Sequence, residues 1–109
     1  MDSGVERRVK AEALVREVND RIREVHEALA GDEDVQLDLL CECGDESCTA
    51  LLSVTLDEYE ATRLDDRRLL VAPDHAREAG GRIVAVNAEF AIVVKTGEAG
   101  DLLSGLALG

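Results

Sequence analysis

Three cysteines stand within eight residues of one another, and this spacing constrains the fold of the chain more than any other feature. Cys41, Cys43 and Cys48 follow the pattern C-x-C-x4-C in the stretch LLCECGDESCTALL. A structural zinc site takes four ligands, usually thiolate or imidazole, in a tetrahedron. The sequence therefore predicts that a fourth ligand completes the set and binds one zinc ion together with the cysteines.

A metal cross-link matters here because the core of the chain is small in volume. Among 109 residues only Tyr59 and Phe90 are aromatic, and there is no tryptophan. The core must therefore be built from valine, leucine, isoleucine and alanine. A domain with such a core gains more from a cross-link between its elements than a larger domain does.

Residues 3–30 are predicted to form one amphipathic helix. Ser3 and Glu6 have the spacing of a capping box, and Gly31 followed by acidic residues indicates the end of the helix. Its apolar residues recur at intervals of three and four: Val15, Val18, Ile22, Val25 and Leu29. We expect this stripe to pack on the domain's own sheet, and pairing of the helix across a homodimer is the alternative.

The segment VQLDLLC alternates apolar and polar residues, which predicts a half-buried strand. The strand directs Cys41 to its inward face, and Cys43 follows on the same face where the extended geometry continues. The turn GDES then returns the chain to Cys48. Two cysteines on one face and a third returned by a turn predict a ligand knuckle.

Further elements are predicted after the knuckle. A short strand runs up to Thr55, where a two-turn helix begins with capping-box spacing to Glu58. Residues 82–86 and 90–95 are rich in β-branched side chains and predict two strands. We therefore predict an α+β fold, in which the N-terminal amphipathic helix packs on a small antiparallel sheet with a Cys3His zinc knuckle.

The pattern is that of one domain. We predict a single zinc-binding α+β domain over residues 1–97, with the helix at 3–30 and the zinc and sheet region at 34–97. The glycine-rich end of the chain shows no period. Residues 98–109 are therefore predicted to be a loosely ordered tail.

His75 is the predicted fourth ligand. Pro73 ends the apolar run LLVAP, so His75 lies in a turn just beyond a strand end, where its side chain can reach a neighbouring element. His26 on the helix is the rival ligand, and Glu42, Asp45 or water are further alternatives. Free buried cysteines or a redox-active thiol pair are alternatives to zinc, whereas the usual spacings of an iron–sulfur cluster are absent. The predicted metal site is Cys41, Cys43, Cys48 and His75.

The runs LCECGDESCTALLSVTLDEYEATR and RRLLVAPDH together resemble a family of small, largely uncharacterised actinobacterial proteins. That family has a CECG-x3-C segment, an EY-containing helix and a V-x-P-G-H turn, and the resemblance covers roughly residues 5–97. The resemblance implies an association among the three cysteines and His75, and it implies no particular activity. The chain departs from the family at Asp74, where the family has glycine, and at Leu70, where an aromatic residue is usual. Glycine allows positive φ more readily than aspartate, so the first departure bears on the turn.

The charge of the chain indicates which partners it can have. The formal net charge is -12, and residues 31–60 carry ten acidic residues and no basic one. Nucleic-acid binding needs Lys and Arg against phosphates, and an anionic membrane surface repels acidic proteins. We therefore expect no nucleic acid and no membrane. The acidic block is either a solvated face or a surface for a basic protein partner.

The cellular location follows from two further sequence features. The start of the chain lacks the apolar run of a signal peptide, and no segment approaches about 20 apolar residues. We expect a bacterial cytoplasmic protein. In a reducing compartment, clustered cysteines indicate metal or thiol chemistry more than a disulfide framework.

Catalytic motifs are absent from the sequence. It contains no H-E-x-x-H, no P-loop and no G-x-G-x-x-G. We therefore expect a non-catalytic regulatory or protein-interaction module whose zinc holds the fold. The alternative is a thiol redox sensor, in which oxidation of Cys41 and Cys43 releases the zinc.

Overall fold

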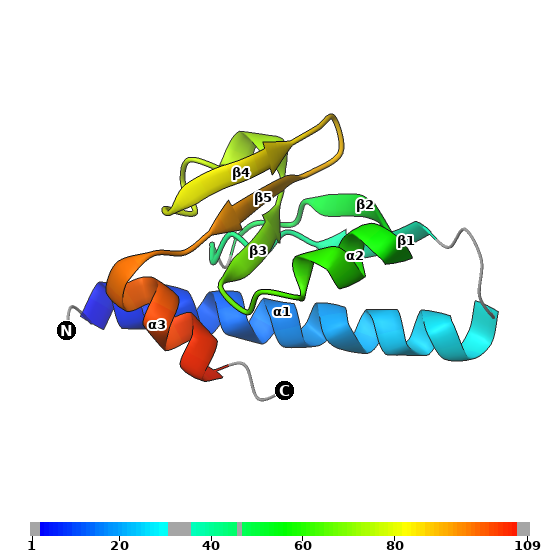
Figure 1. Ribbon diagram of the computed structural model, residues 1–109, viewed down its shortest axis with the longest axis horizontal. Coiled ribbons are helices and arrows are strands. Elements are labelled where there is room, and N and C mark those ends of the chain that lie inside the picture. The colour runs from blue at the N-terminus through cyan, green and yellow to red at the C-terminus, as the bar shows by residue number, and fades with distance from the viewer. Residues whose placement is uncertain (1–2, 31–35, 46, 107–109) are drawn as a thin grey trace.

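The computed structural model describes residues 3–30, 36–45 and 47–106 (Figure 1). The predicted α+β class is confirmed, with a long N-terminal helix, small antiparallel sheets and a Cys3His cluster. The elements are α1 Ser3–Ala30, β1 Gln36–Leu40, β2 Leu51–Thr55, α2 Leu56–Thr62, β3 Arg68–Val71, the 3-10 helix Pro73–His75, β4 Arg82–Val86, β5 Ala91–Val94 and α3 Gly97–Leu106.

The strands form two antiparallel sheets where the sequence predicted one. β1 pairs with β2, and in the second sheet β5 lies between β3 and β4. Figure 1 shows α1 running along one side of the molecule, with α3 crossing it and β4 at the edge remote from it. The core lies between these layers, and the largest fully buried side chains are mainly leucine and valine.

The start of α2 follows the predicted capping box. The Glu58 N–H donates to Thr55 Oγ1 at 3.1 Å, and the Thr55 N–H donates to Glu58 Oε1 at 2.8 Å. The two side chains therefore satisfy donors that a helix start leaves without partners.

The bounds of α1 agree with the prediction, but the expected packing face is wrong. Val18 and Val25 are 40% and 56% exposed, and only Ile22 of the described stripe packs against the core. The side chain of Leu29 and the predicted stop at Gly31 lie outside the described residues. The face of α1 that is buried carries Val9, Glu12, Arg16 and Asn19.

Specific partners explain why this polar face is buried. Arg16 donates to the carbonyl oxygens of Asp66 at 2.5 Å and Leu103 at 3.1 Å. The Lys95 ammonium lies 3.2 Å from Glu12 Oε2. Buried charges are tolerated only where such partners exist, and here the tertiary contacts supply them.

The end of the described chain differs from the expected loose tail, because residues 97–106 form α3. Its buried Leu103 packs in the core, and α3 lies against α1. Gly100 is required at a close approach, because a Cβ there would lie 2.5 Å from the carbonyl oxygen of Lys95. The glycines thus belong to a packed helix, although they interrupt the apolar periodicity by which a helix is predicted from sequence.

Membrane crossing by a helix is not indicated. Within the described ranges, each helix falls short of the length or the apolar character that a membrane span needs.

Candidate metal centre

β1 carries the first two cysteines into the core. Cys41 follows two fully buried leucines on the inward face of the strand, and Cys43 is fully buried. The Cys41 N–H donates to the carbonyl oxygen of Ala50 at 3.1 Å. The Glu42 N–H donates to the carbonyl oxygen of Leu70 at 2.8 Å. The C-E-C segment is therefore fixed on both sides by backbone hydrogen bonds.

A glycine turn brings the third cysteine back. Gly44 has φ of 82°, and a Cβ there would lie 2.9 Å from Cγ of Glu12 and 3.0 Å from Cγ of Arg8. Both the conformation and the close approach to α1 therefore require glycine. The Cys48 N–H then donates to the carbonyl oxygen of Asp45 at 3.0 Å, which closes the turn.

His75 lies just after β3, a strand of the other sheet. Pro73 begins the 3-10 helix after β3, and His75 ends it. Asp74 lies inside this helix, whose backbone conformation any L-residue adopts, so the turn does not require glycine at this position. The Nδ1 atom of His75 lies 3.5 Å from Sγ of Cys41 and 3.4 Å from Sγ of Cys48.

These four side chains can bind a metal ion. Their ligand atoms all lie within 4.8 Å of one another. In a tetrahedral zinc site, bond lengths of about 2.3 Å to sulfur and 2.0 Å to nitrogen place neighbouring ligand atoms roughly 3.5–3.8 Å apart. The two sulfur-to-nitrogen distances match that spacing. The donor set therefore fits a metal such as zinc, and the role of these residues as zinc ligands stays a prediction.

Burial sets the protonation of the thiols. It raises the pKa of Cys41 to about 12, although the Ala72 N–H donates to its Sγ at 3.1 Å and favours the thiolate. Burial also raises the pKa of Cys43, against a backbone hydrogen bond from Asp45. A bound divalent cation reverses this preference, because it deprotonates a coordinating thiol. The N–H donors are already placed to stabilise those thiolates.

The three rival ligands lie elsewhere or have other partners. His26 is a partly exposed residue of α1 and is not among the grouped ligand atoms. Asp45 Oδ1 accepts hydrogen bonds from the N–H and the hydroxyl of Ser47, at 2.9 and 2.7 Å. Glu42 is fully buried and its carboxylate contacts residues outside the cluster. The geometry therefore groups His75 with the cysteines.

Glu42 is a site residue whose main role the sequence analysis missed. Its carboxylate accepts hydrogen bonds from Asn19 Nδ2 at 2.8 Å, Arg63 Nη2 at 2.5 Å and the Leu70 N–H at 2.9 Å. Asn19 also exchanges two hydrogen bonds of 2.9 Å with the backbone of Leu40. Glu42 lies between Cys41 and Cys43 in the sequence, and its hydrogen bonds link this segment to α1, to the end of α2 and to β3. An acidic residue inside a segment that is predicted to be buried needs polar partners, and this was the sequence signal for the role of Glu42.

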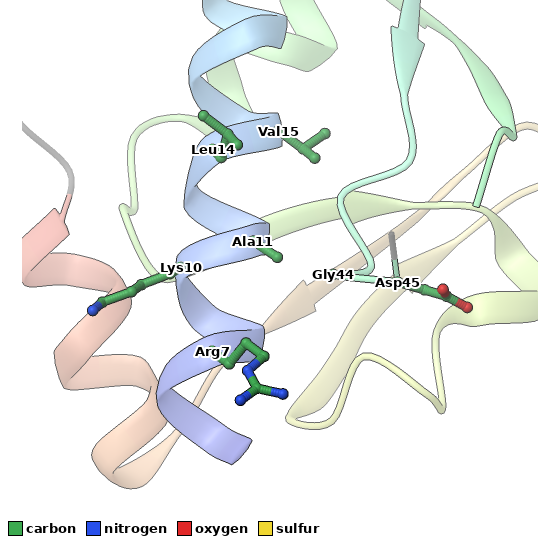
Figure 2. Close-up of a pocket in the computed structure, with 7 residues that line it drawn as sticks. All are labelled: Arg7, Lys10, Ala11, Leu14, Val15, Gly44 and Asp45. Carbon is green, nitrogen blue, oxygen red and sulfur yellow. The ribbon is translucent and has the colours of Figure 1, made fainter. Parts of the chain in front are cut away.

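A small cavity adjoins the knuckle without opening on its sulfurs. It has a volume of about 330 Å³ and lies between α1 and the Gly44 turn, with Ala11, Leu14 and Val15 on the helix side (Figure 2). Asp45 lines the opposite side. The cluster cysteines and His75 are not among its lining residues. The cavity therefore provides no approach to the grouped ligand atoms.

Comparison with protein-family models, with curated proteins and with solved structures gives no match to this chain.

Proposed function

We propose that this protein is a non-catalytic regulatory or protein-interaction module that binds one structural zinc ion through Cys41, Cys43, Cys48 and His75. The observation that carries the proposal is the convergence of their four ligand atoms within 4.8 Å. The residues come from the β1 end, its following turn and the 3-10 helix after β3. A zinc ion there cross-links the two sheets and acts in the reducing cytoplasm, in keeping with the resemblance to the small actinobacterial proteins.

Three features support a structural role over a catalytic one. Cys41 and Cys43 are 6% and 0% exposed, so two of the four ligands are sealed from solvent. The set already supplies four protein ligands, whereas catalytic zinc keeps one position for water. The neighbouring cavity is lined by other residues. Glu42 further couples the site to three elements of the fold, so metal binding stabilises the folded chain.

Metal analysis of the purified protein tests this proposal. We expect one zinc per chain in protein prepared without chelator or acid. Cys43→Ser and His75→Ala should lower zinc affinity, and Cys43→Ser should lower thermal stability by much more than a surface substitution, which is usually within about 0.5 kcal/mol. His26→Ala is the matched control and should leave zinc affinity unchanged.

Two results would contradict the proposal. Wild-type protein without bound metal would remove the zinc site. Loss of zinc in His26→Ala with retention in His75→Ala would move the fourth ligand to α1.

A second candidate function is thiol redox sensing, which the proximity of the three sulfurs favours. Here a peroxide oxidises the Cys41 and Cys43 thiolates to a disulfide, is itself reduced to water, and zinc is released. Metal content and free thiols should then fall together after mild peroxide and recover with reductant. Unchanged metal content after the same treatment would leave only the structural role.

A further inference from the structure

The three α-helices border an open groove, which shares Lys10 and Leu14 with the cavity beside the Gly44 turn. The groove has a volume of about 1040 Å³ and is lined from α1, α2 with its following turn, and α3. In Figure 1, α3 crosses α1, and α2 lies beside α1. Three leucines line the groove with exposed side chains: Leu14 at 62%, Leu64 at 87% and Leu106 at 36%. Apolar side chains gathered around one depression are typical of an interaction surface.

The basic residues at the base of the groove already have partners. The Arg16 guanidinium donates to two backbone carbonyl oxygens. Arg63 pairs with Glu42 at 2.5 Å and with Asp20 at 3.1 Å, and it stacks over Tyr59 at 4.7 Å from the ring centroid. These cations are therefore committed to the fold and offer little positive charge to a partner.

The rim of the groove is acidic. Glu17 and Glu24 line it with exposed side chains, and among the described residues neither takes part in a salt bridge. Glu60 is paired with Arg23 at 3.2 Å. Lys10 is paired with Glu6 at 3.0 Å. The charge left for a partner to neutralise is thus negative.

We propose that this groove binds an amphipathic helix of a partner protein, with leucine-like side chains on one face and Lys or Arg beside them. Such a helix inserts its apolar face between Leu14, Leu64 and Leu106, and its cations meet Glu17 and Glu24. Helix-in-groove recognition uses this combination of apolar anchors and flanking charge. A second copy of this chain fits less well, because its net charge of -12 adds repulsion. This inference rests on the interaction role proposed above and names its partner class.

Arg63 connects the groove to the metal centre. It contacts Glu42, which lies between two of the grouped cysteines, and it also lines the groove. The metal site thereby helps to fix the base of the surface that the partner helix contacts.

The test uses the full, zinc-loaded chain and a synthetic peptide of about 15 residues, long enough for helix formation on binding. The peptide carries leucines at i, i+3, i+4 and i+7 and lysines elsewhere, and its control has glutamate in place of lysine. Fluorescence anisotropy should show binding of the lysine peptide only, weakening as salt rises. Leu64→Ser should weaken binding at least tenfold. Leu51→Ser is the matched control, because Leu51 is equally a surface leucine, 65% exposed, on β2, and it should change the affinity less than twofold.

Charge reversal gives the second arm of the test. Glu17→Lys with Glu24→Lys should weaken binding at least fivefold, whereas Asp38→Lys with Glu89→Lys, at exposed acids elsewhere, should have a smaller effect. Equal losses in the two pairs, or equal binding by the Leu64 and Leu51 variants, would overturn the groove as the site. Self-association abolished by Leu64→Ser would show that a second copy occupies it. Metal content is measured in the same variants, so that failure of the groove proposal can be told apart from failure of the zinc proposal. A zinc-loaded chain that does not bind the peptide would contradict the groove proposal alone.

Discussion

The buried and outward faces of α1 depart from the usual arrangement of an amphipathic helix. The face against the domain contains several polar side chains, and on the outward face apolar side chains lie among charged ones. The buried face includes Glu12, Arg16 and Asn19, and the outward face includes Leu14, Val18 and Val25.

Magnitudes explain why the polar face is the buried one. Leaving an apolar side chain exposed forgoes about 1.5–3 kcal/mol for each residue. Turning α1 over would remove Glu12 from Lys95 and Arg16 from its two carbonyl acceptors, and breaking a buried charge pair costs about 3–5 kcal/mol. It would also remove Asn19 from Glu42 and from the backbone of Leu40. Buried polar partners therefore orient this helix more strongly than its apolar stripe does.

Removing the cation of the buried pair should have the largest effect. Among the described residues, Lys95→Met leaves Arg8 as the one cation beside the buried Glu12, with its Nε 3.5 Å from Glu12 Oε2. We expect the free energy of unfolding in urea to fall by about 3–5 kcal/mol. Lys10→Met removes an exposed pair with Glu6 and is the matched control, which should change stability by about 0.5 kcal/mol or less.

The double variant makes the same experiment specific to the ion pair. Glu12→Met together with Lys95→Met removes both buried charges and should recover most of the loss. If Lys95→Met lowered the free energy of unfolding as little as Lys10→Met does, the ion pair would not explain why the polar face of α1 is buried.

The ionisation of Glu12 should make stability depend on pH. Burial raises the pKa of Glu12 above 4.5, against the attraction of Lys95 and Arg8. The folded chain therefore holds the Glu12 proton more tightly than the unfolded chain does. This contribution to stability is complete below pH 4.5 and is lost as pH rises through the folded pKa. Glu12→Gln lacks this loss, so its stability relative to wild type should improve between about pH 4 and about pH 7. Urea unfolding of both proteins over this pH range measures the difference in stability. If Glu12→Gln instead became less stable relative to wild type, the attraction of Lys95 and Arg8 would outweigh burial and the pKa of Glu12 would be lowered.

Substitutions on the outward face should have the smallest effect. Val18→Ser changes a side chain that is exposed and is not part of the core, so the free energy of unfolding should change by about 0.5 kcal/mol or less. Val9→Ser, at a fully buried position of the same helix, should cost about 2 kcal/mol or more. A large loss in Val18→Ser would show that this face is covered in solution, as in the homodimer considered from the sequence.

Local structure and the chemistry of the candidate site could be predicted from the amino-acid sequence. The α+β class follows from alternation and apolar periodicity, the bounds of α1 from its capping-box spacing and the glycine after it, and the strand Arg82–Val86 from β-branched residues. All of these signals lie in neighbouring residues. The start of α2 follows from the capping box at Thr55. The grouping of His75 with the cysteines was predictable because the chain has few residues of that chemistry and Pro73 locates the turn.

The buried face of α1, the contacts of Glu42 and the packing of α3 could not be predicted from the sequence. Each depends on partners that are remote in sequence: Glu12 and Lys95 are 83 residues apart, and Arg16 and Leu103 are 87 apart. A pattern of apolar spacing measures the area that a helix can bury, but it carries no information on whether a distant cation or carbonyl will meet a buried charge. The orientation of α1 was therefore set by those distant hydrogen bonds, which form only when the whole chain is folded.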